Sequence, residues 1–181
     1  MLGSHNIANA MAAAAGALSL GLSMEVVAGG LRSFGGVAHR LEPVAEIAGV
    51  RYVNDSKATN VEATRTALAS FETGVHLILG GSLKGENCDP LLPLVSEHCS
   101  AVYLIGEAVP ALEIALAPAT AAGVHIEVSG DLATAVAAAS GRALLGETVL
   151  LSPSCASFDQ FRDYEDRGET FGRIVGDLNG S

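Results

Sequence analysis

The chain has 181 residues, 49% of them hydrophobic, and it carries 10 Lys and Arg against 20 Asp and Glu, a formal net charge of −10. Such an acidic chain has no long-range positive field for nucleic acid or an anionic membrane, so we expect partners of neither kind. No apolar run approaches the roughly 20 residues of a membrane-spanning helix, which excludes membrane insertion, and three cysteines without a C-x-x-C pair are typical of the reducing cytoplasm.

The first 38 residues contain two predicted helices, at residues 4–20 and about 24–33. The first is rich in alanine and apolar on nearly all sides, which predicts burial on more than one face. Two helices cannot supply that burial by themselves. We therefore expect residues 1–38 to be the last helices of a domain whose larger part is absent from this chain.

Residues 39–181 alternate apolar runs with helical patterns, which is typical of a parallel sheet flanked by helices. Two strands around a tight turn predict a β-hairpin at residues 42–53 that opens this domain. Further strands are predicted at residues 75–79, 101–105, 124–128 and 148–151. Further helices are predicted from residue 59 and near residues 90–97, 110–116, 132–144 and 164–178. The predicted fold class is α/β, Rossmann-like, with a mostly parallel sheet.

Three polar loops follow predicted strands, at residues 54–60, 80–87 and 152–161. In a parallel sheet all three lie beyond its carboxyl edge, where open α/β folds bind ligands. Thr59 and Glu62 have the spacing of a capping box, which predicts a helix whose positive end favours an anion. Cationic and hydroxyl side chains suited to a carboxylate or phosphate would then converge: Lys57, Thr59, Lys84, Ser154 and Ser157.

Simpler interpretations of the same residues stay open. For one loop alone, a plain turn at Gly80 and Gly81 with a solvated Lys84 is equally good. G-G-S-L-K-G is neither a P-loop nor the G-x-G-x-x-G fingerprint, which disfavours a nicotinamide enzyme. Cys155 has no recognisable His partner and is expected to be a packed thiol. The histidines lack metal-ligand spacing, so we expect this chain to build no metal site.

Polar residues on the first and last predicted helices have simple structural interpretations, and those on the first also allow a binding role. Asn6 and Asn9 share a face at the positive end of the first helix, where their amides suit a base edge or a phosphate. Ordinary N-capping by Asn6 with an exposed Asn9 is the simpler interpretation. In the last helix, the charged segment 162–173 is expected to be the solvated face opposite an apolar stripe.

Five motifs, in this order, resemble the Mur ligase family over essentially the whole chain. N-D-S-K-A-T-N and S-P-x-C-A-S-x-D-Q-F resemble its D-glutamate-adding branch in particular. The motifs are H-N-I-A-N (residues 5–9), V-A-H-R-L-E (37–42), V-N-D-S-K-A-T-N (53–60), L-G-G-S-L-K-G (79–85) and L-S-P-S-C-A-S-F-D-Q-F (151–161).

The resemblance implies a three-domain enzyme of the cytoplasm. Residues 1–38 would end its central ATPase domain, and residues 39–181 would form its C-terminal Rossmann-like ligase domain. In the family, ATP phosphorylates the carboxylate of UDP-N-acetylmuramoyl-L-alanine, and the amine of D-glutamate attacks the acyl phosphate during peptidoglycan precursor synthesis. Mg²⁺ and cationic side chains neutralise the moving phosphoryl group. The phosphate loop and the magnesium ligands would lie in the absent N-terminal and central domains, so we expect this chain alone to be inactive.

The resemblance also implies a role for each matching residue. Asn6 and Asn9 would contact the adenine of ATP. Arg40 and Asp55 would contact its phosphate and ribose. The residues beside the reacting groups are Ser56 and Lys57. Thr59, Lys84 and Ser157 would hold the D-glutamate carboxylates, in a pocket lined by Phe158 and Tyr164. Two other functions stay open: a stand-alone Rossmann-like binding module for an acidic metabolite, and a sibling ligase that adds another amino acid.

Overall fold

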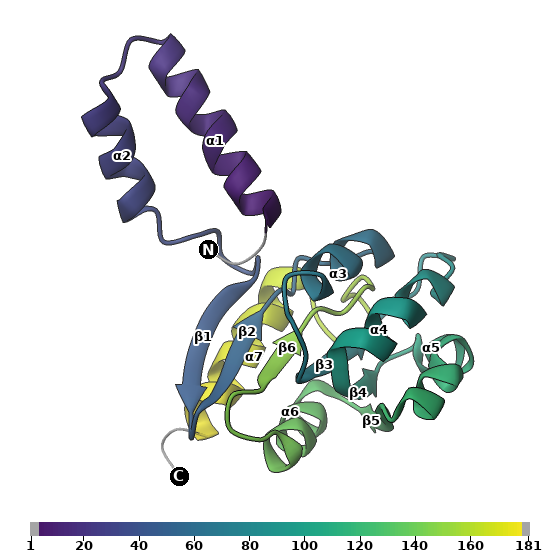
Figure 1. Ribbon diagram of the computed structural model, residues 1–181. Helices are drawn as coiled ribbons and strands as arrows, with labels where there is room; N and C mark the ends of the chain where they lie inside the picture. The colour runs from purple at the N-terminus through teal and green to yellow at the C-terminus, as the bar shows by residue number, and fades with distance from the viewer. Residues whose placement is uncertain (1–3, 179–181) are drawn as a thin grey trace. The chain divides into compact units, whose positions relative to one another are not determined.

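A computed structural model of the protein describes residues 4–178, with side chains from residue 7 onward. The chain divides into two compact units, residues 1–38 and residues 39–181 (Figure 1). The first unit consists of two helices in contact, α1 (Ser4–Ser19) and α2 (Met24–Ser33). Ser23 caps α2, because its hydroxyl accepts a hydrogen bond from the backbone N–H of Val26 at 3.3 Å.

Most apolar side chains of the first unit are uncovered. Val27 is its one buried hydrophobic residue among the described side chains, whereas Met11, Leu20 and Met24 are 67%, 84% and 68% exposed. Several large apolar side chains exposed on two helices are typical of a surface that packs against other protein. The assignment of residues 1–38 to a larger domain stays a prediction, and this uncovered surface is what such a domain would bury.

The second unit is built on a six-stranded sheet in the order β1-β2-β6-β3-β4-β5. The predicted hairpin is confirmed: β1 (Glu42–Ile47) and β2 (Val50–Asn54) are antiparallel and turn at Ala48 and Gly49, both with positive φ. The other strands all run parallel to β2 and to one another. They are β3 (Val75–Gly80), β4 (Cys99–Ile105), β5 (His125–Gly130) and β6 (Thr148–Leu151). The sheet is therefore mostly parallel, as the sequence predicts.

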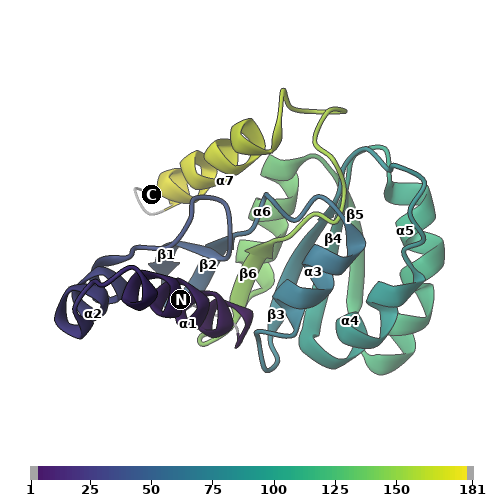
Figure 2. The ribbon, with the colours of Figure 1, turned by 90° about the horizontal axis from the view of Figure 1, so that it is seen from above.

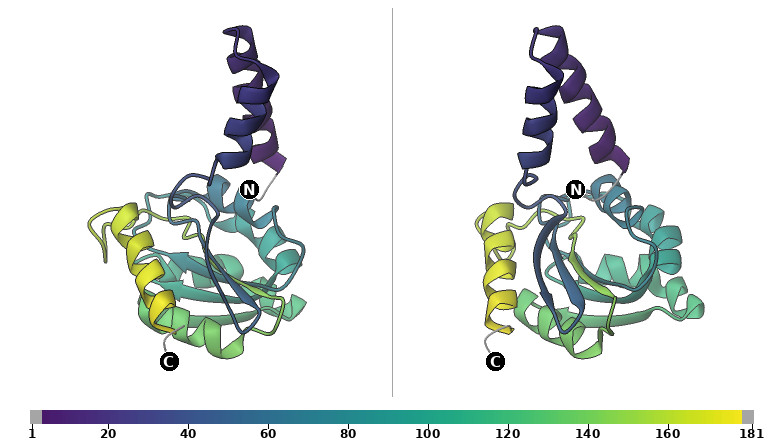
Figure 3. Two further views of the ribbon diagram at one scale, coloured as in Figure 1. Left: turned by 90° about the vertical axis from the view of Figure 1, so that its left-hand side faces the viewer. Right: turned by 60° about the vertical axis from the view of Figure 1, so that its left-hand side comes forward.

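Helices cover both faces of this sheet (Figure 2). One face carries α6 (Leu132–Arg142) and α7 (Tyr164–Leu178), whose buried side chains join those of the strands in one apolar core. α7 also runs beside the β1–β2 hairpin (Figure 3). The other face carries α3 (Val61–Leu68), α4 (Leu92–His98) and α5 (Val109–Leu116), with short 3-10 helices η1 (Asp89–Leu91) and η2 (Ala117–Ala122). Every residue of β3 and β6 is buried, because central parallel strands are covered on both faces.

The predicted start of α3 is wrong by two residues. Asn60, not Thr59, is the N-cap, since its side chain accepts a hydrogen bond from the N–H of Ala63 at 2.8 Å. The capping box with Glu62 does not form, because that carboxylate pairs with Arg65 at 2.6 Å. Within residues 4–178, no helix is long and apolar enough to cross a membrane.

Candidate anion-binding site at the carboxyl edge of the sheet

The three polar loops meet because their strands are neighbours, with β6 lying between β2 and β3. The backbone N–H of Asp55 donates to the last residue of β6 at 2.8 Å, and that of Gly80 donates to the carbonyl of Pro153 at 2.9 Å. Ser82 and Ala156 exchange two backbone hydrogen bonds, of 2.9 and 3.2 Å. The predicted convergence of these loops is confirmed.

Gly80 and Gly81 do more than form a turn. Their φ angles are 132° and 135°, in a region that residues with a Cβ rarely adopt. A Cβ at Gly80 would collide with the carbonyl oxygen of Ile105, and a Cβ at Gly81 with that of Ala156. The two glycines therefore allow the loop after β3 to approach its neighbours closely.

Asp55, on the loop after β2, is buried, with 7% of its surface exposed. One carboxylate oxygen accepts the hydroxyl of Ser152 at 2.8 Å, and the other accepts the N–H of Leu41 at 3.2 Å. Burial raises the pKa of Asp55 to about 6, although these two bonds and the charge of the exposed Arg40 act in the opposite direction.

The raised pKa of Asp55 should make stability fall as pH rises from about 4 to 6. Over that window the folded state keeps a proton that the unfolded state has released, so increasing pH favours unfolding. Asp55→Asn should reduce the stability lost between pH 4 and pH 7 by about 1–3 kcal/mol. Urea unfolding at both pH values measures this loss. The same change at the exposed Asp89 should leave the loss as in the wild type, and an equal loss in Asp55→Asn would contradict the expectation.

Lys57 and Tyr164 form one cluster where the loop after β2 meets α7. The Lys57 ammonium donates to the Tyr164 hydroxyl at 3.0 Å and lies 4.8 Å from the ring centroid. That hydroxyl in turn donates to the carboxylate of Glu165 at 2.7 Å. The hydroxyl that distinguishes Tyr164 from phenylalanine therefore fixes the position of the lysine.

Arg167 is the residue that the sequence prediction placed wrongly. It was expected on a solvated face, yet it is completely buried, and burial lowers its pKa to about 10. Its guanidinium donates to the carbonyls of Cys155 and Ser56 at 3.2 and 2.9 Å and to the Ser56 hydroxyl at 3.0 Å. The Ser56 hydroxyl donates to the carbonyl of Tyr164 at 2.7 Å. Arg167 and Ser56 thus tie α7 to two loops, and the fully buried Ser56 has a positioning role in this structure.

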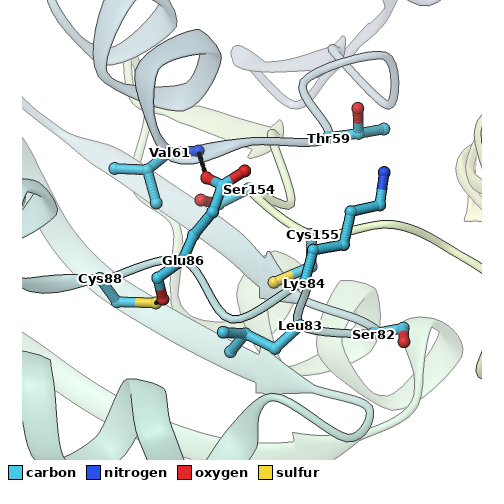
Figure 4. Close-up of a pocket in the computed structure, with 9 residues that line it drawn as sticks. All are labelled: Thr59, Val61, Ser82, Leu83, Lys84, Glu86, Cys88, Ser154 and Cys155. Carbon is cyan, nitrogen blue, oxygen red and sulfur yellow. Dashed lines mark hydrogen bonds between the residues drawn. The ribbon is translucent and has the colours of Figure 1, made fainter.

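A small pocket, partly open to solvent, lies between the start of α3 and the loop after β3 (Figure 4). It brings together Thr59 and Lys84, two of the three residues predicted to hold carboxylates. The exposed Lys84 ammonium makes no hydrogen bond or ion pair with the described part of the chain. The lining residues are Thr59, Val61, Ser82, Leu83, Lys84, Glu86, Cys88, Ser154 and Cys155.

Ser154, which was also expected to converge here, belongs to that lining, whereas the remaining predicted site residues lie outside it. Ser157 is buried at 2% exposure, and Phe158 is 70% exposed on the same loop. Asn9 is exposed on α1, and the side chain of Asn6 lies outside the described residues.

Cys155 is a buried thiol whose pKa burial raises to about 12, which agrees with a packed residue. Among the described side chains, no three His, Cys, Asp or Glu residues could hold a metal ion together.

The parallel sheet, the close approach of the loops at Gly80 and Gly81, and the pocket that contains Lys84 define a Rossmann-like α/β domain with a pocket at the carboxyl edge of its sheet. Residues 39–155 match the family model described as "Mur ligase, glutamate ligase domain". The chain therefore belongs to the Mur ligase family.

Its curated relatives include proteins named UDP-N-acetylmuramoylalanine--D-glutamate ligase. The chain is 46% identical to the one from Acidobacterium capsulatum and 48% identical to the one from Myxococcus xanthus, over 173 residues each. These matches cover 96% of the chain and 37% of each relative, so the chain spans just over a third of their length.

Solved structures with the same fold are more distant in sequence. MurF from Acinetobacter baumannii has a TM-score of 0.71 at 20% identity, covering 99% of this chain and 38% of that one. Folylpolyglutamate synthase from Mycobacterium tuberculosis, complexed with ADP and AMPPCP, has a TM-score of 0.66 at 16% identity, covering 100% and 41%. The predicted fold class is confirmed by these similarities.

Proposed function

We propose that this chain is the C-terminal part of an ATP-dependent ligase that adds D-glutamate to UDP-N-acetylmuramoyl-L-alanine, in the cytoplasm, during peptidoglycan precursor synthesis. The observation that carries this proposal is the Lys84 ammonium, which has no partner among the described residues and lies beside Thr59 in a pocket at the carboxyl edge of the sheet. The names of relatives at 44–48% identity support the choice of substrates.

In this proposal the two units belong to different domains of the complete enzyme. Residues 39–181 form the C-terminal ligase domain, and residues 1–38 are the last helices of the central ATPase domain. The uncovered Met11, Leu20 and Met24 support the second assignment, because a neighbouring part of that domain would bury them.

The pocket suits an acidic amino acid. The Lys84 ammonium and the Thr59 hydroxyl are donors for carboxylate oxygens, and charge-assisted bonds of this kind are the stronger ones. Ser157, Phe158 and Tyr164 complete the pocket in this proposal, since they lie on or directly after the loop that supplies Ser154 and Cys155 to its wall. Held in this way, the substrate amine would be positioned for attack on a carbonyl carbon.

ATP would supply the phosphoryl group that activates the acceptor carboxylate, with Mg²⁺ neutralising its charge. The exposed guanidinium of Arg40 fits a phosphate group, and the buried Asp55 keeps only the lone pairs not used by Ser152 and Leu41 for a ribose hydroxyl. Asn6 and Asn9 would contact the adenine. The magnesium ligands are proposed to lie in the central domain.

Lys57 would act electrostatically at the reacting carboxylate. Its ammonium is held by the Tyr164 hydroxyl at 3.0 Å, so its charge is fixed in place before the substrate binds. Ser56 holds the same loop through Arg167 and is a positioning residue.

The direct test is an amide chemical-shift titration of the isotope-labelled chain with D-glutamate, L-glutamate and L-lysine in parallel. We expect shifts around Thr59, Lys84 and Ser157 with D-glutamate, and none with L-lysine, because a second ammonium group would be repelled by Lys84. Equal shifts with L-glutamate would favour a module or a sibling ligase that does not select the D-enantiomer. A response to L-lysine alone would refute the proposal.

In the complete enzyme that contains this chain, Lys84→Ala should weaken the affinity for D-glutamate at least tenfold. The change removes a charge-assisted hydrogen bond of about 1.5–3 kcal/mol. The KM for D-glutamate at saturating ATP measures the effect. Arg51→Ala removes an exposed cation from β2, outside the pocket, and should leave KM unchanged. An unaltered KM in Lys84→Ala would remove this lysine from the site.

A further inference from the structure

The pocket already contains a carboxylate that belongs to the chain itself. Glu86, on the loop after β3, reaches the first residue of α3, where its Oε2 accepts the N–H of Val61 at 3.0 Å (Figure 4). Asn60 caps the N–H of Ala63 and leaves that of Val61 without an intrahelical partner. A negative charge at this end of α3 is favoured by the helix dipole. Glu86 therefore lies where a helix N-terminus receives an anion.

A second feature indicates independently that a ligand is received there. Ser154 lines the same pocket and is only 5% exposed, yet its hydroxyl has no hydrogen-bond partner among the described residues. Its φ of 61° is a left-handed conformation that residues with a Cβ adopt at a cost, and such strain clusters at binding sites. Since buried hydroxyls are normally hydrogen-bonded, this one is available to an acceptor atom of a ligand.

Glu86 is held loosely and does not use the cation of the pocket. No ion pair joins it to Lys84, and in the described part of the chain its carboxylate makes only the hydrogen bond to Val61. The side chain belongs to an exposed stretch of the loop. It can therefore leave the end of α3 without breaking other contacts.

We propose that Glu86 is an internal competitor of the acidic substrate: its carboxylate occupies the subsite of one substrate carboxylate and must leave before the substrate binds. This inference rests on the proposed function, because it takes the substrate to be an acidic amino acid. Glu86 carries the same carboxylate as glutamate, on the same pair of methylene groups. Once it has left, the Val61 N–H can hold the substrate together with the Ser154 hydroxyl and the Lys84 ammonium, which Glu86 does not use. Glu86 thus raises the substrate concentration that fills the site.

The experiment titrates the labelled chain with D-glutamate, L-glutamate and glutarate, a dicarboxylate without an amine, and compares four proteins. In Glu86→Ala the dissociation constant for D-glutamate and glutarate should tighten about two- to fivefold, since the competing anion at the helix end is gone. Glu86→Gln keeps an acceptor for Val61 without the charge and should tighten it less. Glu107→Gln removes an exposed charge after β4, outside the pocket, and should match the wild type. The Val61 amide should move in ligand-free Glu86→Ala and move back as ligand binds.

The outcomes separate this inference from the proposed function. The competitor role of Glu86 would be overturned if the wild type and Glu86→Ala bound the ligands with equal affinity and the Val61 amide signal did not shift. Shifts of the Thr59 and Lys84 amide signals in the same titration would leave the proposed function intact. Tightening with L-glutamate and glutarate but not with D-glutamate would support the competitor and count against the proposed function. Absence of binding by every ligand to all four proteins would overturn both.

Discussion

Replacing Arg167 with methionine is expected to lower the free energy of unfolding of the second unit by about 3–5 kcal/mol. Methionine fills much of the same volume, so the loss comes from hydrogen bonds and not from a cavity. The buried carbonyls of Cys155 and Ser56 and the Ser56 hydroxyl would lose their donor, and each unsatisfied buried acceptor costs about 1–3 kcal/mol. Urea unfolding measures the change, and the complete enzyme should lose activity as the Lys57 loop loosens.

The opposing effect is the cost of burying the guanidinium. Arg167 forms no ion pair with a carboxylate in the described part of the chain. Burial lowers its pKa to about 10, so the guanidinium keeps its charge at neutral pH. Apolar replacements of buried charges are sometimes neutral because this cost disappears. Here the acceptors left behind are backbone carbonyls that cannot be removed, so we expect destabilisation. Arg173→Met changes an exposed arginine of the same helix and should have little effect; stability within about 1 kcal/mol of the wild type in both variants would show that desolvation cancels the bonds.

The strands and their common edge could be predicted from local patterns. The apolar runs at β3 and β6 and the alternation at β2 each identify a strand, and the polar loop that follows each one marks its end. A parallel sheet then places the three loops at one edge by a general rule. That β6 lies between β2 and β3 is a property of the crossover connections, which no local pattern contains.

Arg167 shows where pattern reasoning failed. It lies three residues after Tyr164 and four before Phe171, on the apolar stripe that the sequence itself identified. The charge suggested solvent, whereas the spacing indicated burial. The contacts that make burial tolerable come from Ser56, 111 residues earlier in the chain, and only the fold shows them.

The predictions of the start of α3 and of the side chains in the pocket failed for a related reason. Thr59 and Asn60 are both good N-cap residues, and the choice between them depends on whether Glu62 turns back or pairs with Arg65. Glu86 at the Val61 N–H is a contact across 25 residues, and nothing in the loop sequence predicts it. Local spacing identified the loops of the site but not which side chain of each loop faces inward.

Gly81→Ala is expected to lower the free energy of unfolding by about 2–4 kcal/mol and to weaken binding of D-glutamate at the same time. A φ of 135° costs a residue with a Cβ about 1–3 kcal/mol, and the added atom would also meet the backbone carbonyl of Ala156. Backbone cannot rotate away as a flexible side chain does. The loops after β3 and β6 would therefore separate at the Ser82–Ala156 bridge, beside the pocket that Ser82 lines.

A second glycine separates backbone strain from close approach. Gly123 also has a positive φ, 88°, but a Cβ there would meet no atom within 4 Å, so Gly123→Ala should cost only about 1–2 kcal/mol, the cost of the left-handed backbone. Equal losses at both positions would mean that the contact with Ala156 is unimportant. The double variant of Gly81→Ala and Arg167→Met adds a sharper criterion, because both changes loosen the loop that contains Ala156. The double variant should lose less free energy of unfolding than the sum of the losses in the two single variants. A loss equal to that sum would show that Gly81 and Arg167 stabilise different parts of the site.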